Sequence, residues 1–424
     1  MMDEAALTAE VAAPPAAGPR AIARPLRIRD FRLLFTGETI SMLGDQFHFV
    51  ALAWLALELT GSGLVLGTVL LVAGLPRAVL VLFGGALADR VSPRTVMLVS
   101  NALRAVVVGL LAALVLTGTV QLWMLYLLAL LFGAVDAFFW PAQGAIVPML
   151  VRDDDLPAAN GLLQGSQQLT GLIGPALAGL LVAAVGTGWA FGLDAASFAV
   201  AALALVLIAG GRRSATAVVG QPGILRTIGS GIAYAWRDPA VRALLLLATA
   251  LNFALNGPIA VGLAWLANNR FGGSAEAFGF MLAAFGAGAL IGALVAASLG
   301  HVRELGWLTL GGAAIMGVGL AFIGAAPSVT VVMVMGAAIG LAAGFLNVRV
   351  VAWLQARTPD DTIGRVMSLA MLGSVASAPL SLAVAGALVD VGAVSLLYAL
   401  AGALIVATAL AGVAWGVPAR MRDE

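Results

Sequence analysis

The sequence predicts an all-α integral membrane protein of twelve transmembrane helices, arranged as two pseudo-symmetric six-helix bundles. Hydrophobic residues make up 62% of its 424 residues and charged residues only 10%, whereas a soluble domain has about 25% charged residues. The apolar runs are long enough to cross a hydrocarbon layer of about 30 Å as helices. The second half of the chain also repeats features of the first.

Turn residues and charges divide the apolar runs into twelve predicted spans. They cover residues 34–59, 64–87, 95–117, 121–147, 161–185, 189–209, 243–267, 277–299, 305–325, 328–350, 365–388 and 393–416. An even number of spans puts both termini on one side of the membrane. Nearly all arginines between spans fall on that side, and only Arg270 falls on the other. Because cytoplasmic loops are rich in basic residues, we expect both termini in the cytoplasm and a multi-pass protein of the bacterial inner membrane.

The longest connection and the two ends divide the chain into five regions. We expect a disordered cytoplasmic tail at 1–25, an N-terminal six-helix bundle at 26–210, a cytoplasmic linker at 211–242, a C-terminal six-helix bundle at 243–417 and a second cytoplasmic tail at 418–424. The first tail lacks the basic start and apolar core of a signal peptide. In the linker, Ile224, Ile228 and Ile232 share one helical face, which predicts an amphipathic helix on the inner leaflet.

The two bundles share a sequence repeat. The string "ALAWLA" around Trp54 aligns with "GLAWLA" around Trp265, and Gly67 then aligns with Gly279 after one inserted residue. Chance similarity between spans rich in Ala, Leu and Gly is the alternative explanation. Two parallel repeats joined by a linker are typical of a secondary transporter that rocks around a site near the middle of the membrane.

Composition excludes several kinds of site. The chain has no cysteine, and it therefore has no disulfide, thiolate nucleophile or cysteine metal site. Its two histidines, His48 and His301, are too few for a histidine-rich metal centre. A net charge of +1 argues against nucleic acid as a partner. We therefore expect no metal and no cofactor.

The connection between the second and third spans carries a charged motif. Within "GGALADRVSPRTVML" the motif residues are Gly85, Asp89, Arg90 and Arg94. They resemble the signature that the major facilitator superfamily has at this place, and the resemblance implies a cytoplasmic gate. Ser and Pro at 92–93 depart from the usual pattern. The alternative is a solvated turn whose charges only orient the protein in the membrane.

The fifth span carries a row of small residues in "GLLQGSQQLTGLIGPALAGLL". The row contains Gly171, Gly174, Pro175 and Gly179. It looks like the antiporter signature of the same superfamily, with Ala178 in place of one glycine, and it favours export over uptake. Ordinary close packing of helices through small residues explains the glycines equally well.

Three further stretches are similar to the 12-span drug-efflux branch of that superfamily, which includes macrolide-efflux proteins and enterobactin exporters. They are "LGDQF" with "WLALELTGS", "GAVDAFFWPAQGAIVPMLVRDDDLPAANGL" and "GIAYAWRDPAVRALLL". The resemblance covers about residues 26–416 and implies that spans one, four, seven and ten line a central cavity. Many proton-coupled exporters of the branch carry an arginine in the fourth span, where this chain offers Asp136 instead.

Asp45 and Asp136 lie deep inside the first and fourth spans, and Arg77 and Arg104 lie deep inside the second and third. An unpaired charge at that depth costs several kcal/mol and should face a partner or a wet cavity. We hypothesise that the two acids couple transport to protons, because burial favours a protonated carboxyl and exposure to water a charged one. The repeat aligns Asp45 with Asn256, which would concentrate any proton chemistry in the first half. The alternative is that Arg77 or Arg104 permanently neutralises either acid, whose role is then structural.

Further polar and aromatic side chains are candidates for the cavity and the substrate. The candidates are Glu38, His48, Phe49, Arg77, Arg104, Phe139, Asn252 and Asn256. Glu38, near the inner boundary, is expected at a gate or interface. His48 is expected to donate or accept hydrogen bonds in the cavity, with a proton shuttle as the alternative. An apolar, aromatic pocket with few polar groups suits amphiphilic cargo.

The sequence thus predicts a monomeric transporter that exports hydrophobic or amphiphilic small molecules, in the manner of multidrug or macrolide efflux, with the proton gradient as its energy source. Its expected partners are the lipid bilayer, protons and the small-molecule substrate. A siderophore exporter or a lysophospholipid transporter of the same fold is the alternative, with Arg77, Arg104 and Arg349 as the residues of a basic cavity. An enzyme is disfavoured because no nucleophile-and-base pair stands out.

Overall fold

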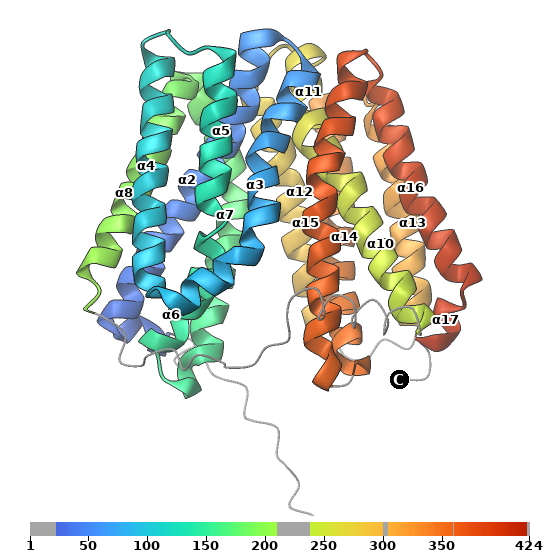
Figure 1. Ribbon diagram of the computed structural model, residues 1–424. Helices are drawn as coiled ribbons and strands as arrows, with labels where there is room; N and C mark the ends of the chain where they lie inside the picture. The colour runs from blue at the N-terminus through green and yellow to red at the C-terminus, as the bar shows by residue number, and fades with distance from the viewer. Residues whose placement is uncertain (1–22, 210–237, 300–303, 359, 422–424) are drawn as a thin grey trace, which may run out of the picture.

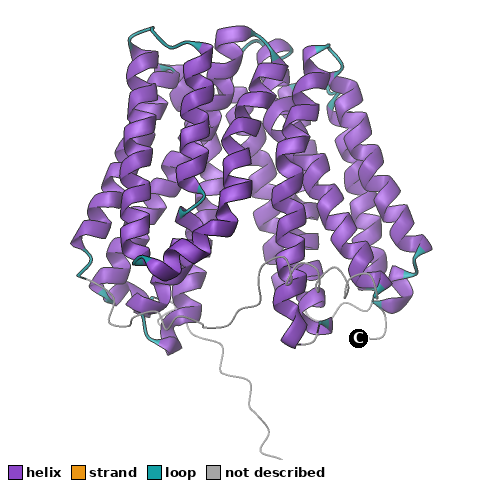
Figure 2. Cartoon of the chain, in the orientation of Figure 1, coloured by secondary structure: helices purple, strands orange, loops and turns teal. Residues whose placement is uncertain are grey.

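The computed structural model describes residues 23–209, 238–299, 304–358 and 360–421, and within 81–90 it describes the helix but not the side chains. These residues form helices and short connections (Figure 2). The N-terminal half contains α2 (Arg29–Thr60), α3 (Gly63–Arg90), α4 (Pro93–Leu116), α5 (Leu122–Asp136), α6 (Phe139–Leu150), α7 (Leu156–Val185) and α8 (Thr187–Leu207), with short turns η2 (Arg24–Arg27) and η3 (Asp153–Asp155). The amphipathic helix expected around Ile228 and most of the first tail lie outside the described residues.

The C-terminal half follows the same plan. It contains α10 (Pro239–Gly257), η4 (Pro258–Gly262), α11 (Leu263–Asn269), α12 (Ala275–Ser298), α13 (Leu305–Ile323), α14 (Val329–Arg357), α15 (Asp360–Asp390), α16 (Val394–Ala414) and α17 (Val417–Arg420). Among the described residues, twelve helical segments are long and apolar enough to cross a membrane. The predicted all-helical fold with twelve spans is confirmed.

Two spans are interrupted, which the sequence analysis did not predict. The fourth span breaks between Asp136, where α5 ends, and Phe139, where α6 begins. Pro141 lies in the first turn of α6, where its missing N–H costs no helical hydrogen bond. The seventh span passes through the π-helical segment η4, which starts at Pro258. The first break places Asp136 at a helix end beside the centre of the molecule.

The two halves meet along two pairs of helices, α3 with α15 and α7 with α12. At Gly67 of α3, an added Cβ would collide with the backbone of Gly386. At Gly279 of α12 it would collide with the backbone at Pro175 and Gly179 of α7. Glycines therefore let the helices of opposite halves approach backbone to backbone, as small residues do in membrane proteins.

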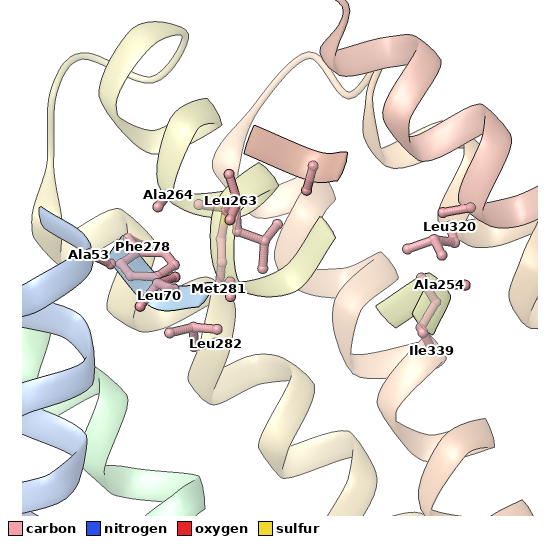
Figure 3. Packing of buried hydrophobic residues seen from close by; sticks show 14 of the residues in the cluster. Ala53, Leu70, Ala254, Leu263, Ala264, Phe278, Met281, Leu282, Leu320 and Ile339 are labelled. Atoms are coloured by element: carbon pink, nitrogen blue, oxygen red, sulfur yellow. The ribbon is translucent and has the colours of Figure 1, made fainter. Parts of the chain in front are cut away.

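The halves are joined at one end of the bundle. We call the end where α2 begins and α16 ends the terminal end (lower in Figure 1), and the opposite one the far end. At the far end the Ser62 hydroxyl donates to Asp390 Oδ1 over 2.6 Å, and the ring of Phe278 packs near Ala53 and Leu70 of the other half (Figure 3). At the terminal end no hydrogen bond links the halves within the described part of the chain, and the two bundles diverge there (Figure 1).

Candidate transport cavity

A cavity of about 740 Å³ lies between the two halves. Its wall is formed by residues of α2, α3, α5, α6 and α7 on one side and of α10, η4, α12 and α15 on the other. Spans one, four and seven line it as the resemblance implies, whereas α14, the tenth span, contributes no described residue to the wall. Spans two, five, eight and eleven contribute instead, because they form the contact between the halves.

All titratable side chains that line the cavity among the described residues belong to the N-terminal half. They are Asp45, His48, Arg77 and Asp136. From the other half, Asn252 and Asn256 face the cavity. Asn252 accepts a hydrogen bond from the Ser374 hydroxyl at 2.8 Å, and Asn256 Nδ2 donates to the Asn252 carbonyl at 2.7 Å. The cavity therefore has one charged wall and one neutral polar wall.

Asp136 is paired with both arginines. Arg104 Nη1 lies 3.1 Å from its Oδ1, and Arg77 Nη1 lies 3.4 Å from its Oδ2. The Arg104 side chain is 1% exposed, whereas that of Arg77 is 49% exposed. The carboxylate thus holds one cation inside the protein and one on the cavity wall. This is the pairing on which the alternative, structural role of Asp136 depends.

Arg104 is fixed by two aromatic rings. Its guanidinium carbon lies 4.1 Å from the ring centre of Phe139 and 4.4 Å from that of Phe198. Arg104 Nη2 also donates to Asn101 Oδ1 over 2.5 Å. Phe139 and Arg104 do not line the cavity but lie behind its wall. Cation–π contacts of this kind stabilise a desolvated guanidinium by about 2 kcal/mol.

Asp45 has a different environment. It lines the cavity, and no described residue forms a hydrogen bond or an ion pair with it. The charged groups that act on it at longer range are Arg104, Asp194, Asp136 and Glu38. Three of these four are acids, and the one cation, Arg104, is bound to Asp136 and Asn101.

Glu38 lies deeper in the N-terminal half. Its side chain is buried, and its Oε2 accepts a hydrogen bond from Gln143 Nε2 of α6 over 2.8 Å. It does not line the cavity. The contact joins α2 to α6, which is an interface position as the sequence analysis expected.

His48 contacts a carboxyl that the sequence analysis missed. Its Nδ1 lies 3.1 Å from Oδ2 of Asp194, which is fully buried on α8. The imidazole stacks on Phe132, with ring centres 4.3 Å apart. The signal for Asp194 was available, because it is the one acid in the apolar run 187–207. Its span, the sixth, is not among the cavity-lining spans that the resemblance implies.

The cavity wall also contains uncharged residues that the sequence did not single out. Phe49 lines the cavity as expected. Trp140, which the sequence suggested as aromatic surface near the charges, also lines it. The further side chains are Gln46, Phe132, Gln167, Thr170 and Phe285. Phe132 and Phe285 resemble any other apolar residue of a span in the sequence, and only the fold shows that they face inward.

No described residue of the glycine row on α7 or of the charged motif between α3 and α4 lines the cavity. On α7, Gly174 faces Gln46 of α2 and Gly179 faces α12 of the other half, whereas an added Cβ at Gly171 would meet no atom within 4 Å. Arg94 donates from Nε and Nη2 to the carbonyls of Leu205 and Val206, each over 2.8 Å, and so ties the start of α4 to the end of α8.

The remaining gate residues, Gly85, Asp89 and Arg90, lie in the segment whose side chains are not described. Their predicted role at a cytoplasmic gate stays a prediction.

Two six-helix bundles around a central polar cavity define a transporter of the major facilitator fold. The sequence profile of the transmembrane secretion effector family matches residues 21–423, and the chain belongs to this family of the major facilitator superfamily.

Several bacterial exporters are similar to this chain over most of its length. It is 24% identical to macrolide efflux protein A of Streptococcus pyogenes over 90% of this chain and 94% of the relative. It is 27% identical to the multidrug efflux pump Tap of Mycolicibacterium fortuitum, over 82% and 86%. It is 28% identical to the enterobactin exporter EntS of Shigella boydii serotype 4, over 80% of each chain.

Solved structures share the fold at lower identity. A bacterial homologue of the iron transporter ferroportin, in an inward-facing state, aligns with a TM-score of 0.72 at 19% identity and covers 92% of this chain and 98% of its own. A bacterial homologue of the human lysosomal transporter Spinster, inward-facing and occupied, aligns with a TM-score of 0.69 at 15% identity over 94% and 97%.

Proposed function

We propose that this protein exports hydrophobic or amphiphilic small molecules from a bacterial cell, in exchange for protons, by alternating access of its two halves. The observation that carries the proposal is Asp45, a carboxyl on the cavity wall without a partner among the described residues. A carboxyl that is enclosed in one state and wet in another binds and releases a proton between the two. The names of the similar macrolide, multidrug and enterobactin exporters support export rather than uptake.

The balance of charge around the cavity supports a role for protons. The described part of the N-terminal half holds two more carboxyls than guanidinium groups in this region. The carboxyls are Glu38, Asp45, Asp136 and Asp194, and the guanidinium groups are Arg77 and Arg104. Each uncompensated charge within the membrane costs several kcal/mol. We infer that the excess carboxyls are neutralised by bound protons when the cavity is closed to water.

Asp136 is the second acid that we propose for coupling. Arg104 is enclosed and stays with it, whereas Arg77 has a half-exposed side chain on the cavity wall. A substrate that draws Arg77 away would leave Asp136 with one partner and change its affinity for a proton. This gives the substrate and the proton a shared group through which they compete.

The cavity wall supports an amphiphilic cargo. Four aromatic side chains face it, and they are Phe49, Phe132, Trp140 and Phe285. Because these rings lie on a wall that also carries charged and amide groups, the cavity suits cargo with both an apolar and a polar part, and aromatic surfaces adapt to several shapes. We assign the terminal end to the cytoplasm from the distribution of arginines. The joined far end would then keep the cavity closed to the outside while cargo enters from the cytoplasm.

The test is proton release from inverted membrane vesicles on addition of macrolides, cationic drugs and siderophores. The parent is compared with Asp45→Asn and Asp136→Asn, and with Asp154→Asn as a matched control on the exposed η3 turn. The proposal expects a compound that releases protons from the parent and the control, with the response lost in Asp45→Asn. If compounds move in all variants with proton release unchanged, the buried acids are structural and the coupling proposal is wrong.

An acidic cargo such as a siderophore or a lysophospholipid is the second candidate. The observation that favours it is the half-exposed guanidinium of Arg77, whose carbon lies 5.5 Å from the ring centre of Trp140 on the cavity wall. A cation beside an aromatic face suits a ligand that is both anionic and aromatic. If this candidate is right, Arg77→Met abolishes transport of the acidic members of the panel and spares the cationic ones.

A further inference from the structure

Asp194 is a buried acid that the proposed export cycle does not yet use. It lies on α8, which contributes no residue to the cavity wall, and its side chain is fully enclosed. The α2 helix reaches it because residue 44 is glycine, where a Cβ would collide with the side chains of Asp194 and Ser197. This close crossing brings His48 to 3.1 Å from Asp194 Oδ2.

The surroundings of Asp194 supply no fixed counter-ion. The Ser197 hydroxyl donates to its Oδ1 over 3.4 Å and more strongly to its own helix. Arg104 of α4 acts on Asp194 from a distance, but its guanidinium is already bound to Asp136 and Asn101. His48 Nδ1 and Asp194 Oδ2 have no hydrogen-bond partner of good geometry in the described chain. A neutral imidazole beside a carboxylate carries one negative charge. The pair is therefore neutral only when it binds one further proton.

The other helices packed against α8 leave this conclusion unchanged. The titratable groups of α2 and α4 that act on the pair are Asp45 and Arg104. Arg29 of α2 and Arg94 of α4 instead bind carbonyls at the C-terminal end of α8. The α7 helix, also packed against α8, has no titratable residue. The pair thus has one further acid and one cation near it, and the cation is already bound to Asp136 and Asn101.

His48 connects this pair to the cavity. Its imidazole lines the wall, one turn from Asp45 on α2, whereas Asp194 is enclosed behind it. A proton from cavity water can bind the imidazole at Nε2, which forms one N–H bond. The hydrogen on Nδ1 then passes to Asp194 Oδ2, so that the second N–H bond breaks and the O–H bond of a protonated carboxyl forms. Release reverses the step, when the N–H bond breaks and the proton returns to water. A change in the crossing of α2 over α8 alters the distance between the two groups and with it the stability of the shared proton.

We propose that His48 and Asp194 form a proton-binding pair in the wall of the cavity, which stores one exchangeable proton behind Asp45. Its part in transport rests on the proposed function, but its existence does not. The pair adds a proton site between α2 and α8, on the contact that would shift as the N-terminal half rearranges.

Infrared spectroscopy of the purified protein in lipid tests the pair without any substrate. The carbonyl stretch of a protonated carboxylic acid is recorded across a pH titration for the parent, Asp194→Asn, His48→Gln and Asp45→Asn. Ser197→Ala is the matched control on the same turn of α8, because it removes a hydroxyl but no titratable group. We expect one protonated-carboxyl band that is lost in Asp194→Asn, retained in Ser197→Ala and Asp45→Asn, and shifted in its pH of disappearance in His48→Gln.

Proton counting by back-titration gives a second measurement, in which Asp194→Asn takes up one proton fewer per molecule than the parent. The inference is overturned if Asp194→Asn leaves all carboxyl bands in place, since Asp194 is then ionised throughout. It is also overturned if His48→Gln leaves the titration of the Asp194 band unchanged. Should Asp194→Asn not fold, the His48→Gln titration decides alone. If Asp45→Asn loses proton release in vesicles but one of these two results is found, proton-coupled export is supported and only the proposed His48–Asp194 pair is wrong.

Discussion

The pairing of one carboxylate with an enclosed and a half-exposed arginine makes a quantitative prediction. Replacing Arg104 with Met removes the buried partner of Asp136, its contacts with two rings and its hydrogen bond to Asn101. Removing one member of a buried ion pair costs about 3–5 kcal/mol, because the other charge stays buried without compensation. Arg77→Met removes a partner of the same carboxylate, but its side chain is 49% exposed. Since exposed pairs contribute about 0.2–1 kcal/mol, it should cost no more than about 1 kcal/mol.

The measurement is the free energy of unfolding by titration with sodium dodecyl sulfate in mixed micelles. A double variant, Arg104→Met with Asp136→Asn, removes both charges together and should recover most of the loss, because no uncompensated carboxylate remains. Equal losses for Arg77→Met and Arg104→Met would refute the reasoning that burial decides the energy. The reasoning would also be refuted if the double variant lost as much free energy of unfolding as Arg104→Met and Asp136→Asn lose together when each is made alone.

Two further predictions concern the contact between the halves and the start of α10. Gly67→Leu should be expressed normally but should abolish transport, because its side chain would collide with the backbone of Gly386. Gly165→Ala is the control, because its added Cβ meets no atom, and it should transport normally. Both are measured by proton release from inverted vesicles. Partial burial acts to raise the pKa of Asp238, but hydrogen bonds from Arg357 and from two amides of α10 outweigh it and hold the pKa below its ordinary value. Asp238→Ala should therefore cost about 1–2 kcal/mol at neutral pH. Because a lowered pKa in the folded state stabilises only the charged form, this difference should shrink as the pH falls through that pKa, and a constant difference would contradict the assignment.

The sequence was sufficient for the helices and for part of the charged wall. Long apolar runs define spans by their length, and the breaks between them follow from turn residues and charges. Asp45, Arg77 and Asp136 stand out because a charge inside such a run is costly and must have a reason. The long connection divides the twelve spans into two sets of six, and the observed helices agree with that division.

Three features could not be predicted. The break after Asp136 depends on Pro141, whose position within a turn is only decided once the helix ends are known. Phe285 faces the cavity through the orientation of its helix, and the weak amphipathic pattern of an apolar span does not reveal that orientation. Asp194 was visible in the sequence, but its partner His48 comes from a helix far away in the chain, and a contact of that range follows only from the fold.

Exchange and gradient-driven transport in proteoliposomes test the central claim most directly. A compound that releases protons from the parent in vesicles is loaded, and its movement is followed with and without an imposed pH gradient for the parent and Asp45→Asn. Proton-coupled export through Asp45 predicts that the variant keeps exchange of the compound across the membrane but loses accumulation driven by the gradient. If Asp45→Asn accumulates the compound against its gradient as the parent does, Asp45 does not couple transport to protons and the account is wrong.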